Sequence, residues 1–213
     1  CETWLAGADC SDAPGLHECD PEGYLDTELV QRDLIGADLV ILVVEDPDQF
    51  GVAWLNCGNG PGADPDVGNC DAGSGCGVVE YDAADAFSTM AHESGHLLGG
   101  LHDANNGGTT YNRGYRVPGE FATVVAYTCD VGGDCDGTYA DRVGFYSTPD
   151  VLWEGSIPMG VAIGSAGEAD NAGHFGLSIP AVAAFRSHVD CRGKVPTIIG
   201  TSAAETLDGT AGN

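Results

Sequence analysis

Basic side chains are scarce in this 213-residue chain, which has 7 lysines and arginines against 33 aspartates and glutamates, a net charge of −26. Lys194 is the only lysine. Because nucleic acids and anionic membranes bind clustered lysines and arginines, the shortage excludes both as partners. An apolar run long enough to cross a bilayer is also missing, so no membrane insertion is expected. The composition predicts a soluble globular protein with one main domain.

The cysteines lack the CxxC spacing that is typical of structural zinc knuckles. Disulfides, which form in an oxidising compartment, are therefore the expected role of the nine cysteines. Nine is an odd number, so at least one cysteine is free or bonds outside this chain. The pattern predicts a secreted, extracellular protein.

Most of the acidic excess is expected to be a solvated surface that keeps the protein soluble. Some aspartates lie in loops rich in glycine and asparagine, where hard oxygen ligands for Ca²⁺ can converge. Plain solvation is the alternative at each of these positions. The candidate calcium ligands are Asp64, Asp66, Asp71, Asp130, Asp134 and Asp136.

Hydrophobic periodicity predicts alternating helices and strands in the first hundred residues. A segment whose apolar residues recur at helical spacing is followed by a continuous run of β-branched residues, which is typical of a buried strand. Two shorter apolar runs predict two more strands. The helix is expected over 24–36, and the strands over 37–46, 51–57 and 77–81, whereas 104–175 reads as largely irregular.

Two further helices are predicted. The first has Asp82 as its N-cap and ends at Gly99 and Gly100, since glycine accepts the left-handed conformation that closes a helix. Its inward face is expected to hold Phe87, Met90, Ala91, Ser94, Leu97 and Leu98. The second covers 178–189, with Pro180 in its first turn.

Half of the six histidines lie in the stretch HESGHLLGGLHD, residues 92–103. His92 and His96 are four residues apart on the predicted helix, so their imidazoles share one face. Gly99 allows the chain to turn back, so that His102 supplies a third nitrogen. Three neutral imidazoles and one open position are typical of a catalytic zinc site, and unrelated surface histidines are the alternative.

Glu93 follows the first histidine and lies one step round the helix. From there its carboxylate reaches a zinc-bound water without being a ligand. We therefore expect Glu93 to be a general base that takes the proton of this water and later passes it to the leaving amine.

The motif HESGHLLGGLHD resembles the pattern HExxHxxGxxHD of the metzincin zinc endopeptidases. Its last aspartate is similar to that of the reprolysin-like branch, and more closely to bacterial relatives that include the peptidyl-Asp metalloendopeptidases. The blocks GYLDTELVQRDLIGADLVILVVED, GVAWLNC, TVVAYTC and FYSTPDV resemble those enzymes in the same order, over roughly residues 20–190.

The resemblance implies an α/β (α+β) zincin catalytic domain with a twisted mixed sheet, an active-site helix and an irregular C-terminal subdomain. It implies hydrolysis of internal bonds in protein or peptide substrates. The alternative is a non-catalytic, calcium-stabilised surface or adhesion module with a relic zinc site. Glu93 disfavours that alternative, because a structural zinc site has no use for a general base.

The chain departs from the family pattern at two places. The methionine beneath the zinc is replaced by Val125, which an apolar packing role tolerates. The family's N-terminal strand, helix and strand are not recognisable before Tyr24. A cleaved N-terminal chain of the same precursor, which would then be a partner, is one interpretation; elements that lie outside the given sequence, or that the protein lacks, are the alternatives. Tyr127, two residues after Val125, is a candidate zinc ligand or oxyanion donor, with simple packing as its alternative.

Two more residues receive roles from the resemblance. Asp103 is expected to contact the backbone or a group that orients the zinc site. The resemblance implies that the segment containing Arg142 forms the wall of the S1′ pocket, which receives the residue after the scissile bond. There Arg142 would hold the carboxylate of an aspartate. Pairing with Asp141 or another structural carboxylate is the alternative for Arg142.

The domain organisation follows. Residues 1–194 are expected to form the catalytic domain, beginning with a Cys-rich loop at 1–22. Residues 195–213 form a tail in which Gly200-Thr201 recurs after nine residues, a period that resembles hemolysin-type calcium-binding repeats. A disordered tail is the alternative on composition alone.

Overall fold

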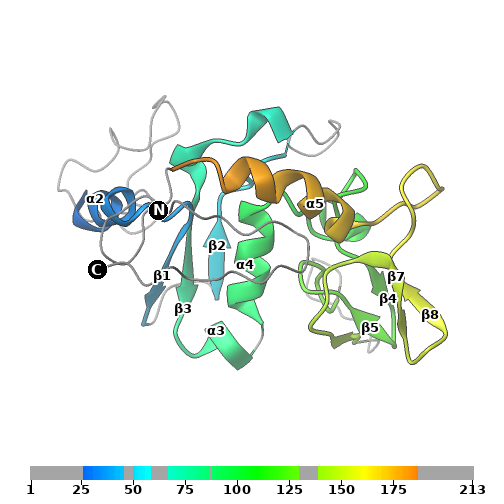
Figure 1. Ribbon diagram of the computed structural model, residues 1–213. Coiled ribbons are helices and arrows are strands. Elements are labelled where there is room, and N and C mark those ends of the chain that lie inside the picture. Colours follow the sequence, from blue (N-terminus) through cyan, green and yellow to red (C-terminus); the bar gives the residue numbers. More distant parts are fainter. Residues whose placement is uncertain (1–25, 46–49, 59–66, 87, 130–138, 187–213) are drawn as a thin grey trace, which may run out of the picture.

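The computed structural model describes residues 26–45, 50–58, 67–86, 88–129 and 139–186. Several predictions lie outside these described residues: the Cys-rich start, the C-terminal repeat, and the calcium candidates Asp64, Asp66, Asp130, Asp134 and Asp136. The described residues form a sheet with helices beside it and a second region of short strands (Figure 1).

The main sheet has three strands in the order β1-β3-β2, namely β1 (Val40–Val44), β2 (Gly51–Ala53) and β3 (Cys76–Glu80). β1 is parallel to β3, and β2 is antiparallel to it, with Gly51 opposite Val79. β3 is buried on both faces, as a central strand must be. The predicted mixed sheet is therefore confirmed, although the strands are shorter than their apolar runs.

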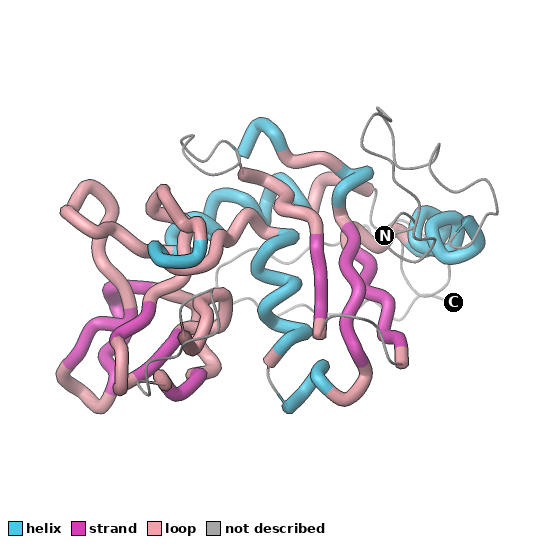
Figure 2. The backbone as a smooth tube through the Cα atoms, turned by 180° about the vertical axis from the view of Figure 1, so that it is seen from behind, coloured by secondary structure: helices cyan, strands magenta, loops and turns pink. Residues whose placement is uncertain are grey.

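The α-helices of the described residues are α2 (Asp26–Ile35), α3 (Ala83–Ala86), α4 (Thr89–Leu97) and α5 (Asn171–Val182). Short 3₁₀ helices cover η2 (Val67–Asn69), η3 (Ala72–Ser74) and η4 (Ala104–Asn106). α4 packs beside β2 and β3, whereas α2 lies beyond β1 at the other end of the sheet (Figures 1 and 2).

The prediction of one continuous helix from Asp82 is wrong. α3 ends at Ala86, and Ser88, with a left-handed φ of 54°, begins α4. Of the predicted inward face, Leu97 is buried and Met90, Ala91, Ser94 and Leu98 are half-buried, while Phe87 lies outside the described residues. The other buried positions of α4 are Thr89, His92, Glu93 and Gly95. A count of apolar residues misses this arrangement, since the helix buries its chemically active side.

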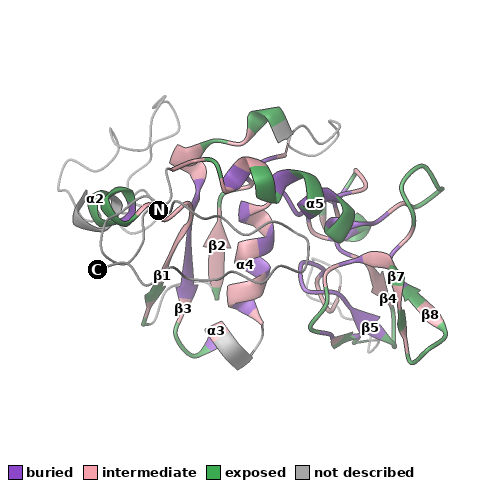
Figure 3. Cartoon of the chain, in the orientation of Figure 1, coloured by how far each residue is buried: buried purple, intermediate pink, exposed green. Residues whose placement is uncertain are grey.

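The region that the sequence predicted as irregular contains short strands. β4 (Arg116–Val117), β5 (Phe121–Ala122) and β6 (Asp141–Arg142) form one sheet, and β7 (Thr148–Trp153) pairs with β8 (Ile157–Met159). Phe121, Val143 and Met159 form the buried core of this region, where β5 appears as a buried strand (Figure 3). Strands of two or three residues are too short to show a period of two in the sequence.

α5 starts earlier than predicted. Asp170 is its N-cap and accepts a hydrogen bond from the Gly173 backbone N–H at 2.9 Å. Pro180 therefore lies in the later part of the helix and not in its first turn, which corrects the prediction. The sequence hid this start because residues 171–176 include asparagine, histidine and two glycines, which are weak helix formers.

A disulfide joins Cys57 to Cys70. Cys76 and Cys129 are also disulfide-bonded. Among the helices of the described ranges, none has the length and apolar character needed to cross a membrane.

Candidate metal centre

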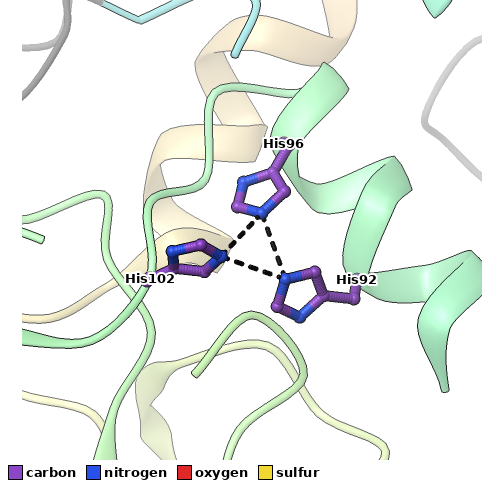
Figure 4. Close-up of side chains that lie close together, drawn as sticks. All are labelled: His92, His96 and His102. Carbon is purple, nitrogen blue, oxygen red and sulfur yellow. Dashed lines mark hydrogen bonds between the residues drawn. The ribbon is translucent and has the colours of Figure 1, made fainter. Parts of the chain in front are cut away.

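Three histidine side chains converge at the end of α4 (Figure 4). His92 and His96 project from neighbouring turns of the helix, and His102 comes from the segment that follows it. The Nε2 atom of His96 lies 3.1 Å from that of His92 and 3.1 Å from that of His102. The Nε2 atoms of His92 and His102 are 3.2 Å apart.

The hydrogen bonds on the far side of two of these rings identify their tautomers. His92 Nδ1 lies 2.9 Å from the Val124 carbonyl oxygen, and His96 Nδ1 lies 2.6 Å from that of Gly100. A carbonyl oxygen only accepts, so both Nδ1 atoms carry the proton and donate. Burial lowers the pKa of His92 to about 3 and that of His96 to about 4, which keeps both rings neutral. Their Nε2 lone pairs therefore face each other without a proton to share.

This donor set fits zinc. A tetrahedral ion with Zn–N bonds of about 2.0–2.1 Å places its nitrogen ligands about 3.3–3.4 Å apart. The three measured separations of 3.1–3.2 Å are close to that value. Converging neutral imidazoles need a cation to become favourable neighbours, and the backbone bonds to Nδ1 orient the rings for one. The arrangement leaves a fourth position for substrate or water.

Glu93 lies between the two helical ligands in sequence and is only 4% exposed. Among the described residues its carboxylate has no hydrogen-bond or ion-pair partner. Burial raises the pKa of Glu93 to about 7. A buried, unpartnered carboxylate is costly, and a neighbouring cation would favour its charged form. This orphaned group is a second observation that fits a metal at the histidine cluster.

The turn between His96 and His102 depends on glycine. Gly99 has a φ of +91°, and a Cβ there would collide with His174 Nε2 and lie 2.8 Å from the Cys57 carbonyl oxygen. The Gly100 N–H donates to the Gly95 carbonyl oxygen at 2.7 Å, which closes the helix. The chain can then reverse direction within the few residues that separate the second and third ligands.

Val125 lies directly beneath α4. A Cβ on Gly95 would come within 2.7 Å of Val125 Cγ2 and 3.0 Å of Tyr146 Cε1, so the helix approaches both side chains closely. Tyr146 also donates its hydroxyl to the Ala91 carbonyl oxygen at 2.7 Å. The resemblance to the metzincins pointed to Val125 in the place of the family's methionine. It did not point to Tyr146, although the segment FYSTPDV contains this residue.

Asp103 connects the third ligand to the turn that contains Val125. Its Oδ2 accepts hydrogen bonds from the Tyr127 backbone N–H at 3.0 Å and from Asn106 Nδ2 at 2.7 Å. Its Oδ1 accepts from the Asn105 backbone N–H at 3.1 Å. The buried carboxylate thus holds two chain segments on the same side of the histidine cluster.

Tyr127 lies against the histidines. Its ring centroid is 4.3 Å from that of His102 and 6.1 Å from that of His92. Within the described ranges its hydroxyl has no hydrogen-bond partner. Burial, with the nearby Glu93 and Asp103 carboxylates, raises the pKa of Tyr127, so the phenol keeps its proton.

Arg142, on β6, approaches His92 from the Nδ1 side of its ring. Its Nη1 donates to the Val124 carbonyl oxygen, which also accepts from His92, and lies 3.4 Å from His92 Nδ1. The arginine ion pairs in the part of the chain that the structure describes involve Arg32 and Arg186, not Arg142. The expected alternative, pairing with Asp141, is absent among these pairs. Among the described residues the half-buried Arg142 has no carboxylate partner, in a chain of net charge −26.

Asp71 is the calcium candidate that the structure describes, and it has a different local role. Its carboxylate caps η3 by accepting from the Gly73 N–H at 3.1 Å and from the Ser74 hydroxyl at 2.9 Å. Within the described residues, the histidine cluster is the group with the geometry of a metal site.

A helix with two histidines and a buried glutamate, followed by a glycine turn and a third histidine, defines the metallopeptidase class of site. The comparison of sequences agrees. Residues 24–141 match the domain described as metallo-peptidase family M12B, reprolysin-like. The chain belongs to this family.

Curated relatives point the same way. A peptidyl-Asp metalloendopeptidase of Xanthomonas campestris is 29% identical over 169 residues, covering 78% of this chain and 35% of the relative. Another, from Pseudomonas aeruginosa, is 30% identical over 143 residues, covering 56% of this chain and 23% of the relative. The chain thus spans about a third or less of the length of these relatives. A solved structure titled "Structure of a chaperone-substrate complex" matches with a TM-score of 0.54 and 25% identity, over 83% of this chain and 28% of that one.

Proposed function

We propose that this domain is a zinc-dependent endopeptidase that hydrolyses internal peptide bonds of proteins or peptides. The observation that carries the proposal is the convergence of three Nε2 atoms within 3.2 Å beside a buried glutamate that has no described partner. A binding module with a structural metal would gain nothing from a buried, unpaired carboxylate, so the geometry favours catalysis.

His92, His96 and His102 would hold Zn²⁺, which when bound would supply Lewis-acid polarisation of the scissile carbonyl and would acidify water at neutral pH. The remaining steps belong to the protein. The Glu93 carboxylate accepts a proton from the attacking water and then delivers it to the leaving amine nitrogen. The Val124 and Gly100 carbonyl oxygens hold the His92 and His96 rings in place throughout.

Tyr127 is proposed as an oxyanion donor. Its phenol is protonated, lies against His102 and has a hydroxyl without a described partner. A hydroxyl at this place can donate to the oxygen of the scissile carbonyl as negative charge develops there. The hydrogen bond that the Tyr127 backbone N–H donates to Asp103 holds Tyr127 in this position.

Arg142 is proposed to select an acidic residue after the scissile bond. Its guanidinium is anchored by the Val124 carbonyl oxygen beside the first zinc ligand, and its other nitrogens have no described partner. Guanidinium binds a carboxylate through two parallel hydrogen bonds, which lysine cannot reproduce. The relatives named peptidyl-Asp metalloendopeptidase support an aspartate preference here.

Glu93→Gln tests the catalytic proposal. The variant should keep bound zinc and lose about 10²-fold or more in rate on an unfolded protein substrate, because the general base is gone. Removal of metal by a chelator should abolish cleavage, and zinc should restore it. Zinc-loaded Glu93→Gln with normal activity would exclude Glu93 as the base. Zinc-loaded wild-type protein with no cleavage would favour the relic-site alternative.

Cleavage-site profiling on a peptide library tests the specificity proposal. Wild-type protein should enrich aspartate or glutamate after the cut, and Arg142→Ala should lose this enrichment. Arg186→Ala is the matched control, because it removes an equal charge from an ion pair with Asp33. An unchanged profile in Arg142→Ala would refute the role of Arg142.

Secretion and structural calcium complete the proposal. The Cys57–Cys70 disulfide supports an oxidising compartment. The density of aspartates in the loops at 58–76 and 130–138 supports calcium, whose removal should then lower the melting temperature of zinc-replete protein.

A further inference from the structure

α5 turns a polar face toward the protein interior. Asn171, His174 and Ser178 follow helical spacing and are each 0% exposed. On the outer side, Leu177 and Ile179 are 57% and 49% exposed. A helix at a protein surface normally does the reverse and buries its apolar side. The polar face formed by Asn171, His174 and Ser178, here called the α5 polar face, must therefore have specific partners inside.

Its partners lie in the turn between the second and third zinc ligands. The end of α4 leaves carbonyl groups without helical partners, on residues that are half-buried (Leu98) or buried (Gly99 and Gly100). Ser178 Oγ donates to the Leu98 carbonyl oxygen at 2.8 Å, and Asn112 Nδ2 donates to that of Gly99 at 2.5 Å. The next carbonyl, of Gly100, accepts from His96 Nδ1. Side chains thus satisfy three consecutive carbonyls of this turn.

The remaining members of the α5 polar face support Asn112 and Gly99. Asn171 Nδ2 donates to the Asn112 carbonyl oxygen at 2.6 Å. The same oxygen accepts from the Leu101 backbone N–H at 2.8 Å, one residue before the third ligand. His174 lies against Gly99 and bonds to the Cys57 carbonyl oxygen at 3.1 Å. α5 crosses near the end of α4 in both views, as these contacts require (Figures 1 and 2).

We infer that the α5 polar face, together with Asn112, is a positioning element that fixes the path of the chain from His96 to His102 and so sets the separation of these two ligands. A buried carbonyl that loses its donor must rotate or recruit water. Rotation at Leu98 or Gly99 displaces the Gly100 carbonyl, which orients His96. These residues touch neither substrate nor metal, and the inference rests on the proposed zinc site.

Ser178→Ala is the direct test, because alanine is a good helix former and the change removes one hydroxyl. The expected result is zinc affinity lowered by about 10- to 100-fold, the effect typical of groups that orient metal ligands. Affinity is measured by competition with a chelator, and the Co²⁺-substituted protein should show an altered visible spectrum. Val182→Ala is the matched control, because it weakens packing of the same helix through a buried residue that has no hydrogen bond to the turn.

Asn112→Ser, which removes the donor to Gly99, should weaken zinc binding in the same way. Wild-type zinc affinity and spectrum in folded Ser178→Ala would overturn the inference. Equal losses in Ser178→Ala and Val182→Ala would also overturn it, since they would show general loosening of α5. Failure of wild-type protein to bind zinc would instead refute the proposed function.

Discussion

Replacement of Gly51 by alanine should disable the general base without disturbing the zinc ligands. Gly51 begins β2, the strand beside α4, and its position is close to Glu93. A Cβ at this place would lie 2.6 Å from Glu93 Oε1, 2.9 Å from Glu93 Cγ and 2.6 Å from Thr89 Cγ2. The glycine therefore leaves the space that the Glu93 carboxylate occupies.

The size of the effect follows from these distances. Non-bonded carbon atoms settle about 3.5–4.0 Å apart, and carbon–oxygen contacts are only slightly shorter. The Glu93 side chain must consequently move by about 1 Å, a displacement of a catalytic group that can cost about 10²-fold in rate. Alanine is otherwise better than glycine inside a strand by about 0.5–1 kcal/mol, so the fold should survive.

The assay compares turnover and zinc content in the same preparation. We expect kcat on a peptide substrate to fall by about 10²-fold with KM little changed, because a group that acts in the transition state is misplaced. Zinc affinity should equal that of wild type. Gly176→Ala is the control, since a Cβ on Gly176 meets nothing within 4 Å. Full kcat in zinc-loaded Gly51→Ala would refute the reasoning, and so would a loss of zinc that accounts for the lost activity.

Three other outcomes are expected. Asp103→Ala removes three hydrogen bonds to a buried carboxylate, and urea unfolding should show a loss of about 3 kcal/mol or more; a loss under about 1 kcal/mol would contradict this. Gly95→Ala should overpack the contact with Val125 and lower the unfolding free energy by about 1–3 kcal/mol. An unchanged melting temperature would contradict this prediction. Metal-free protein should lose stability as the pH falls from about 6.5 toward about 4. Burial lowers the pKa of His92 and His96 in the folded state, so in this range the same histidines bind protons in the unfolded chain but not in the folded one, and protonation favours unfolding. Urea titrations that give a flat profile over this range would disprove the third.

The sequence predicted the convergence of the three histidines better than their surroundings. The i, i+4 spacing of His92 and His96 and the glycine turn before His102 are local features, and local geometry follows directly from them. The main sheet was also predictable, because β1 and β3 are continuous apolar runs. The contact between Arg142 and the Val124 carbonyl joins residues 18 apart through a parallel pair of short strands, and no local pattern encodes it.

The errors have a common physical cause at the two helices around the metal centre. In α4, the apolar residues Met90 and Ala91 were expected inside, yet His92 and Glu93 are more deeply buried. In α5, the prediction placed Pro180 in the first turn, whereas the first turns contain Asn171 and His174.

Both helices therefore bury polar side chains whose partners come from distant parts of the chain. A hydrophobic period reports only the free energy of removing apolar surface from water, so it fails where a helix must instead hold a metal or satisfy a strained turn. In this domain the two departures meet at one place, the turn from Leu98 to Leu101 that carries the chain between the second and third ligands. A helix whose buried face is more polar than its exposed face is thus a pointer to the functional centre, and α5 shows this even though it contributes no ligand itself.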